Sequence, residues 1–265
     1  MALPEPKAGV QRLFNRLSGP YARVVFSRLQ RETQADVAWV HPRAGEKVLD
    51  LACGPGTLAL ELVGYGCRVY AVDLAEQMIA RAQVARRRRR CPPVHFAVAD
   101  VEQLPLPGDV FDLVACAFSF ADFPAPVQAV AEMCRVTRRG GRLAVLEAVA
   151  PEDPAQSAEL DRLERLRSAG VSAHLLSLTE LTALFRQASL ELLDAKVSER
   201  KRRLEDWLGA AVGEGGVPAQ RRLQRHLRVK LLETARGDAA GLHIERHRGH
   251  WFFSAKVAQL LWRKP

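Results

Sequence analysis

The residues best suited to chemistry lie in the segment Val48-Leu-Asp-Leu-Ala-Cys-Gly-Pro-Gly-Thr57. Its apolar start predicts a buried strand, and its glycines predict a tight turn that opens a helix. In α/β folds, ligands bind beyond the carboxyl ends of the strands, and glycine lets the backbone approach the ligand closely. This segment is therefore the first candidate for a ligand-binding loop.

Carboxylates stand at or just beyond the ends of four expected strands: Asp50, Asp73, Asp100 with Glu102, and Asp122. The pattern Gly54-x-Gly56-x-x-Ala59, with Asp73 about 20 residues further on, also fits the dinucleotide-binding fingerprint. However, a carboxylate at Asp50 would repel the diphosphate of a dinucleotide. S-adenosylmethionine has no phosphate and carries a sulfonium and an ammonium group. The acidic rim therefore favours S-adenosylmethionine over a nicotinamide dinucleotide.

Short apolar runs alternate with helical patterns over residues 47–148. We expect strands at 47–51, 68–73, 94–98, 110–116 and 142–148, with helices at 58–63, 75–85 and 127–136. The last of these helices is expected to end in Arg138-Arg-Gly-Gly141, a cationic turn followed by glycine. Strands that alternate with helices at this interval predict a parallel sheet with right-handed crossovers.

The segments on either side of this region are mostly helical. Residues 10–40 have helical spacing that is expected to break at Gly19-Pro20. Ser177-Leu-Thr-Glu180 predicts a capping box that opens a helix through about residue 187. Further strands are expected at 190–197 and 251–261, and a basic amphipathic helix at about 219–235.

Five motifs, in order and with normal spacing, resemble those of class I S-adenosylmethionine-dependent methyltransferases. They are Asp50–Thr57, Val72–Met78, Ala99–Pro105, Phe111–Val114, and Glu132–Val136 followed by Arg139–Leu143. The resemblance covers roughly residues 44–150 and is nearest to the small-molecule enzymes of the quinone-biosynthesis C-methyltransferase branch. It implies a doubly wound, Rossmann-like, mostly parallel sheet of about seven strands. Helices would cover both faces, the last strand would be antiparallel, and a helical lid would cover the site.

The resemblance also implies a set of cofactor-binding residues. They are Asp50, Ala52, Gly54, Pro55, Gly56, Asp73, Leu74, Met78, Asp100, Val101, Cys116 and Phe118. Asp50 and the glycine loop would hold the amino-acid end of S-adenosylmethionine, Asp73 the ribose hydroxyls, and Asp100 the adenine amine. Cys116 and Phe118 would line the methyl exit. Two alternatives stay open: Leu74, Met78 and Val101 could be ordinary core residues, and Asp73 and Asp100 could be helix caps.

Few residues outside these motifs suggest catalysis. Because a sulfonium methyl group is already activated, in-line displacement mainly requires that the nucleophile be held close and aligned. A general base is needed only if the acceptor must lose a proton. Tyr21 and His174 are the candidates, Tyr21 because it lies in an N-terminal segment that often covers the donor in this family. Relatives in the quinone branch carry Tyr-Asp where this chain has Tyr21-Ala22.

Charge is distributed unevenly along the 265 residues. Residues 195–265 contain 16 basic and 7 acidic residues, so they account for the whole net charge of +9. A basic face can attract nucleic acid or an acidic partner. We find no recognisable RNA-binding module, so the sequence does not favour a nucleic-acid partner. A homodimer is compatible with the sequence.

The five cysteines are odd in number and form no C-x-x-C pair, which favours reduced thiols and a cytoplasmic location. No apolar run is long enough to span a membrane, and no secretory signal is expected. His243-Ile-Glu-Arg-His247 could place two histidines on one helix face, but it departs from the metalloprotease pattern. We expect no metal site.

The expected organisation is an N-terminal helical lid over residues 1–43 and a methyltransferase domain over 44–265. Within that domain, residues 44–150 would bind the cofactor, and 151–265 would form the acceptor side and the last strands. The favoured function is methyl transfer to a small molecule. The alternatives are methylation of RNA or protein through the basic C-terminal quarter, and a non-catalytic binding protein that keeps the fold.

Overall fold

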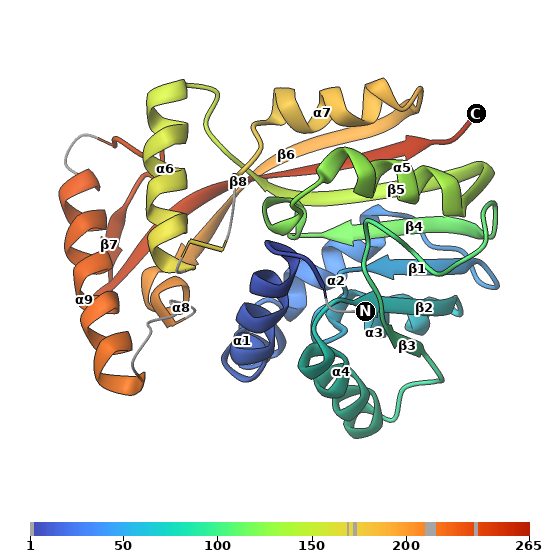
Figure 1. Ribbon diagram of the computed structural model, residues 1–265, viewed down its shortest axis with the longest axis horizontal. Coiled ribbons are helices and arrows are strands. Elements are labelled where there is room, and N and C mark those ends of the chain that lie inside the picture. Colours follow the sequence, from blue (N-terminus) through green and yellow to red (C-terminus); the bar gives the residue numbers. More distant parts are fainter. Residues whose placement is uncertain (1–2, 169, 172–173, 210–215, 236–237) are drawn as a thin grey trace.

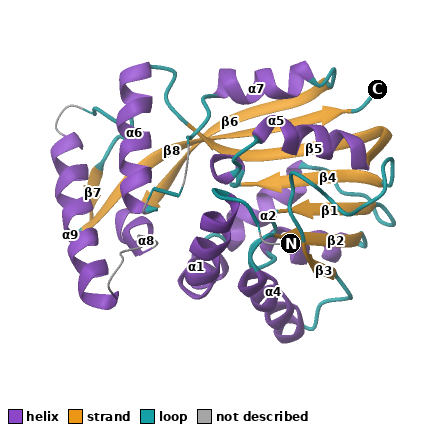
Figure 2. Cartoon of the chain, in the orientation of Figure 1, coloured by secondary structure: helices purple, strands orange, loops and turns teal. Residues whose placement is uncertain are grey.

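The computed structural model describes residues 3–168, 170–171, 174–209, 216–235 and 238–265 (Figures 1 and 2). The parallel part of the sheet comprises β1 (Lys47–Leu51), β2 (Arg68–Asp73), β3 (His95–Val98), β4 (Phe111–Ala117) and β5 (Thr137–Val149). The remaining strands are β6 (Glu191–Arg203), β7 (Glu245–His247) and β8 (His250–Arg263).

The strand order is β3-β2-β1-β4-β5-β8-β6, and β7 pairs with β8 off this path. Strands β1 to β5 are parallel, while β8 runs antiparallel to both β5 and β6. This confirms the doubly wound, mostly parallel sheet with an antiparallel last strand. In the described residues, the short β7 is an addition to the seven strands expected.

Helices cover both faces of the sheet because alternate strand residues point to opposite sides. On one face, Leu49, Val114 and Val145 pack in a core cluster that includes residues of α5 (Pro126–Val136) and α7 (Leu178–Gln187). On the other face, residues of α2 (Gln30–Trp39), α3 (Thr57–Leu62) and α4 (Glu76–Arg89) pack with Val48 and Leu113. The 3-10 turns η1 (Val63–Tyr65) and η2 (Phe120–Asp122) complete this region.

Strands β6 and β8 continue beyond the carboxyl end of the parallel strands and carry a second group of helices (Figure 1). We call the helices α6 (Pro154–Arg167), α8 (Leu204–Gly209) and α9 (Gly216–Ala235), together with β7, the cap. The cap has its own apolar cluster, in which Leu163, Leu204, Leu227 and Phe253 are buried. Helix α1 (Lys7–Arg28) crosses the space between the cap and the parallel strands.

Three sequence predictions about local structure need comment. The capping box is confirmed, since the Ser177 side chain accepts from the Glu180 amide and the Glu180 side chain accepts from the Ser177 amide. The expected break at Gly19-Pro20 is wrong, because α1 runs through Pro20. Proline removes one helical hydrogen bond, but Leu17 and Val25 on either side of it are both buried, and their packing holds the helix together.

The helix predicted at 127–136 is confirmed, but the prediction that Arg138–Gly141 form its cationic last turn and glycine stop is wrong. Helix α5 ends at Val136, and Thr137 begins β5 with its hydroxyl donating to the Met133 carbonyl at 2.7 Å. A Cβ atom on Gly141 would lie 2.8 Å from the Arg138 carbonyl oxygen, so glycine is needed there by an irregular strand rather than by a helix end.

Candidate active site

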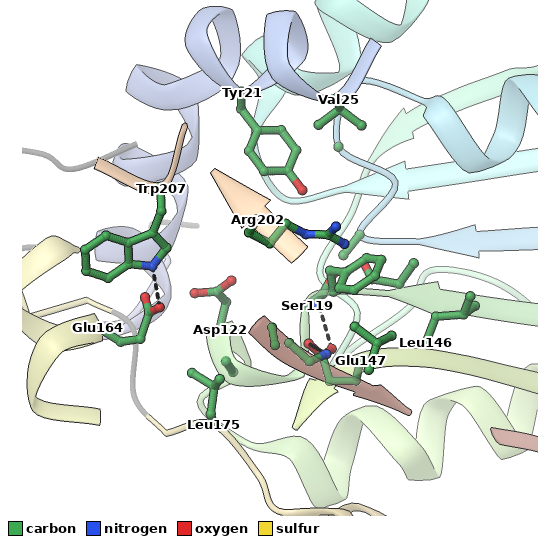
Figure 3. A pocket seen from close by; sticks show the side chains of 18 of the residues that line it. Tyr21, Val25, Ser119, Asp122, Leu146, Glu147, Glu164, Leu175, Arg202 and Trp207 are labelled. Carbon is green, nitrogen blue, oxygen red and sulfur yellow. Dashed lines mark hydrogen bonds between the residues drawn. The ribbon is translucent and has the colours of Figure 1, made fainter. Parts of the chain in front are cut away.

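A cavity of about 550 Å³ lies between the carboxyl ends of the parallel strands, α1 and the cap. This volume falls in the range of small-molecule sites. We call the part lined by Asp50, Gly54, Asp73, Leu74, Met78, Asp100 and Val101 the core half. We call the opposite part the cap half (Figure 3). It is lined by Tyr21, Asp122, Glu147, Glu164, Arg202, Trp207 and Phe253.

The glycine loop after β1 takes an unusual backbone path. Ala52, Gly54 and Gly56 all have positive φ angles, of 50°, 53° and 86°. Gly54 lines the cavity, as do Ala52 and Pro55. Gly56 does not line it; a Cβ atom there would lie 2.9 Å from Cβ of Ala82 on α4. Gly56 thus allows α3 to approach α4, so the structure gives this glycine a packing role, and its predicted contact with the cofactor stays a prediction.

Two buried carboxylates stand on either side of this loop. Asp50 is 1% exposed, and its Oδ2 accepts from the Ala59 amide at 3.0 Å. Burial raises the pKa of Asp50 to about 8, and the nearby Asp73 adds to the rise. Asp73 accepts from the amides of Gly54 and Ala75, both at 2.8 Å, and burial raises its pKa as well. Asp73 therefore clamps the loop to the start of α4 while lining the cavity.

Helix α1 covers the core half through polar contacts. Lys7 Nζ lies 2.5 Å from Asp100 and 2.7 Å from Glu102, the two carboxylates beyond β3. Gln11 donates to the Leu74 carbonyl at 3.0 Å. Leu74, Met78 and Val101 line the cavity, and Met78 and Val101 are also buried. Their contact with the cofactor stays a prediction. Asp100 accepts from the Glu102 amide in a turn rather than capping a helix.

The cap half combines aromatic side chains with acids (Figure 3). Tyr21 of α1 lies near three carboxylates. Burial, together with Asp122, Glu147 and Asp73, raises the pKa of its phenol to about 12. Across the cavity, Trp207 of α8 donates to Glu164 at 2.8 Å, and the Arg167 guanidinium lies 5.5 Å from the centre of its ring.

Arginines of β6 form a wall that is held by acids of α2. Arg200 contacts Asp36 through both terminal nitrogens, and Arg202 makes two 2.8 Å contacts to Glu32. These ion pairs join α2, which packs on the sheet, to β6, which leads into the cap. Phe118, at the end of β4, lines the cavity with a φ of 57°.

Besides Gly56, two further predicted site residues lie outside the cavity lining. Cys116 is fully buried in the apolar cluster beneath β4 and does not line the cavity, so the structure does not bring it to the site where it was predicted. His174 also lies outside the cavity lining, with Nδ1 2.5 Å from Asp161 and Nε2 3.5 Å from Glu180. Burial acts to lower its pKa, but these two acids outweigh that effect and raise it. His174 therefore joins α6 to the start of α7, and its candidacy as a base is not supported.

Sequence reasoning missed Glu147 and Lys7. Glu147 follows four consecutive apolar residues of β5 and is only 4% exposed, yet it lines the cavity. An acid within a buried apolar strand is the signal that could have identified it. The segment His243–His247 is not a helix, because Glu245–His247 forms β7.

Comparison with known proteins agrees with this geometry. Residues 49–145 match the family described as "Methyltransferase domain". The uncharacterized methyltransferase YcgJ of Bacillus subtilis (strain 168) is 30% identical over 184 residues, which cover 69% of this chain and 70% of YcgJ. The crystal structure of YcgJ superposes with a TM-score of 0.76 at 23% sequence identity, covering 88% of this chain and 98% of that one.

A demethylmenaquinone methyltransferase of Beutenbergia cavernae is 37% identical over 124 residues. That match covers 47% of this chain and about half, 49%, of that enzyme. The chain belongs to the family of class I S-adenosylmethionine-dependent methyltransferases. It is an enzyme that uses S-adenosylmethionine as cofactor, and within the family it resembles the quinone-biosynthesis branch. None of the helices in the described ranges is long and apolar enough to cross a membrane.

Proposed function

We propose that this enzyme methylates a small molecule held in the cap half, with S-adenosylmethionine bound in the core half. The observation that carries the proposal is a cavity with two different ends: one is formed by the glycine loop and the acids of the strand ends, and the other combines acids with aromatic side chains. Enclosure by α1 and the cap suits a small acceptor better than a polymer.

The residues of the core half fit the chemistry of S-adenosylmethionine. Asp50 is a buried acid with a raised pKa, and no ion pair is recorded for it among the described residues. An ammonium group of the ligand would favour the ionised form of this acid. Asp73 and Asp100 supply acceptor oxygens for the ribose hydroxyls and the adenine amine.

The bound cofactor supplies an activated sulfonium methyl group. The protein then has to hold the acceptor in line with the S–CH₃ bond and keep water away. Tyr21 and Trp207 present flat surfaces that can fix the orientation of an acceptor, and the ion pairs of Arg200 and Arg202 hold the wall of β6 in place.

The cap half is formed largely by residues outside the segment 49–145 that matches the family. The named activity of the demethylmenaquinone relatives makes a quinol-like ring one acceptor to test. Because the cap lies outside the segment 49–145 that matches the family, we expect the acceptor to be set by the cap.

Calorimetric titration of the purified protein tests the proposal. S-adenosylmethionine and its demethylated product should bind with micromolar affinity, while NADH should not bind. Methyl transfer from radiolabelled S-adenosylmethionine to a panel of phenols, amines and quinols then identifies the acceptor class. Transfer to RNA or protein but to no small molecule would contradict the proposal.

A further inference from the structure

Glu147 occupies a central position in the cap half. It lies near the end of β5, pairs in register with Ala258 of β8, and lines the cavity (Figure 3). The residue is 4% exposed, so water cannot solvate its charge freely. A buried acid in a cavity needs either a partner or a function.

The hydrogen bonds of Glu147 leave one oxygen with spare capacity. Oε2 accepts from the amides of Ser119 at 2.8 Å and Phe120 at 2.9 Å, which uses both of its acceptor sites. Oε1 accepts from the Ala148 amide alone, at 3.1 Å. No ion pair is recorded for Glu147 among the described residues. The three amides fix the carboxylate in one orientation, and Oε1 keeps a lone pair for a ligand.

The surroundings of Glu147 adjust its proton affinity. The ionisable groups that interact with it are Asp122 on η2, the Tyr21 phenol on α1 and the Cys116 thiol on β4. Arg202 of β6 lines the same cavity and is paired with Glu32. The residue opposite on β8, Ala258, brings no charge. Burial raises the pKa of Glu147 to about 7 against the effect of its amide donors, and Asp122 contributes to the rise. A base with a pKa near the working pH is best suited to proton transfer.

The Tyr21 phenol, which also lies at this place, is less suited to the task. The Tyr21 phenol, with a pKa of about 12, stays protonated near neutral pH. It can donate a hydrogen bond to an acceptor, but it cannot take up a proton.

We propose that Glu147 is the general base of the reaction, receiving the proton of an acceptor O–H or N–H group. The inference rests on the proposed function. The lone pair of the acceptor oxygen or nitrogen forms the new bond to the methyl carbon, and the S–C bond breaks with its electron pair left on sulfur. The acceptor proton moves to Oε1 of Glu147 and later to solvent, so no other reactant is required. The substrate class is then an alcohol, a phenol or an amine.

The first test needs no acceptor. NMR of the side-chain carboxyl carbons in the ligand-free protein should show that the Glu147 carboxyl titrates near pH 7. The Glu147 signal is identified as the one that is missing from the spectrum of Glu147→Gln. A Glu147 carboxyl that does not titrate between about pH 5 and 9 would overturn the proposal, because it could not exchange a proton at the working pH.

The second test compares two probe acceptors, phenol and 4-nitrophenol, in the wild-type enzyme and in Glu147→Gln. Phenol must lose a proton to react, whereas 4-nitrophenol is largely ionised above neutral pH. Phenol methylation should fall about 10²-fold or more in the variant, while 4-nitrophenol methylation should fall far less. In the wild type, turnover of phenol should drop below pH 7, and this dependence should vanish in the variant.

The controls separate this role from folding and from donor binding. Glu147→Gln should bind S-adenosylmethionine as the wild type does, and Glu76→Gln, an exposed acid of α4, should behave as the wild type throughout. If Glu147→Gln slowed methylation of phenol and of 4-nitrophenol equally, Glu147 would have a structural role and the inference would be overturned. If neither probe is methylated, the NMR titration alone decides. Failure of the wild type to bind S-adenosylmethionine would instead defeat the proposed function.

Discussion

The core half of the cavity is formed by residues that lie close together in the sequence, whereas the cap half gathers residues from distant segments. Asp50, Asp73 and Asp100 come from three successive strand ends. By contrast, Tyr21, Glu147 and Trp207 come from α1, β5 and α8. In the core half, Asp50 and Asp73 are held by backbone amides, and Asp100 is paired with Lys7 of α1. In the cap half, Glu147 is also held by amides, but Glu164 is held by Arg167.

This difference separates two tasks. A cofactor common to a whole family can be bound by short local motifs, whose geometry follows from the strand order. An acceptor particular to one enzyme needs side chains that only the complete fold brings together. Changes in the core half should therefore affect binding of S-adenosylmethionine, and changes in the cap half should affect the acceptor.

The largest effect on the affinity for S-adenosylmethionine is expected from Asp73→Ala. It removes an acceptor for the ribose and also leaves the amides of Gly54 and Ala75 without their partner. Affinity for S-adenosylmethionine should fall at least tenfold, or about 1.4 kcal/mol, as measured by calorimetry. Glu76→Ala, an exposed neighbour on α4, is the matched control and should not change the affinity. Unchanged affinity in Asp73→Ala would remove Asp73 from the site.

A pH dependence should distinguish Asp50 from the rest of the core half. In the ligand-free protein Asp50 is protonated below its pKa of about 8, and an ammonium ligand requires the carboxylate. Affinity for S-adenosylmethionine should therefore rise as pH increases toward 8, by up to about tenfold per unit, and then level off. Asp50→Asn should lack this rise, and calorimetry over pH 6 to 9 compares the two proteins. The same dependence in both would show that Asp50 does not titrate on binding.

The raised pKa of Asp50 also affects folding stability. Because the folded state holds this proton more tightly than the unfolded state, the contribution is fully present below the ordinary pKa and is lost as pH rises through about 8. In thermal melts, the ligand-free wild type should lose stability between pH 6 and 9 to a greater extent than Asp50→Asn does.

A smaller effect, confined to the acceptor, is expected from Trp207→Ala. This change removes an aromatic wall of the cap half and the hydrogen bond to Glu164. KM for the acceptor should rise roughly tenfold, while the affinity for S-adenosylmethionine stays within about twofold of the wild type. If the affinity for S-adenosylmethionine fell as much as the apparent affinity for the acceptor, the two halves would not act separately.

The smallest effect is expected on the outer face of the cap. Helix α9 buries Leu227 and Leu231, and Leu231 lines the cavity, whereas Arg221, Arg222 and Arg225 are exposed. Replacing the three arginines by glutamine should leave turnover and acceptor KM within about twofold, because exposed charges contribute little. A large change would instead indicate that this basic face binds an acidic acceptor or partner.

The same contrast explains what could be predicted from the sequence. The strands and the cavity-lining Asp50, Gly54 and Asp73 follow from local patterns, in which apolar runs end in glycine or aspartate. The packing role of Gly56 could not be predicted, because it depends on the approach of Ala82 on α4, and no local pattern reports that distance.

The cap half was harder to predict because tertiary packing decides it. His174 looked available in the sequence, but its ring lies against Asp161 of α6. Glu147 follows an apolar run, so local pattern alone did not single it out. The orientation of its carboxylate depends on the amides of Ser119 and Phe120, which follow another strand, β4. The passage of α1 through Pro20 likewise depends on buried neighbours and not on helix propensity.

The position of β8 has a consequence for how the molecule forms. Strand β6 reaches the sheet only through β8, because β5 pairs with β8 and not with β6. During synthesis, the residues of β6, α8 and α9 emerge before residues 250–263 exist to receive them. Strands β1 to β5 can assemble first, whereas the cap can be completed only after β8, the last strand to be synthesised, pairs with β6. A ribosome-bound chain is thus expected to acquire its cofactor-binding framework well before it can enclose an acceptor.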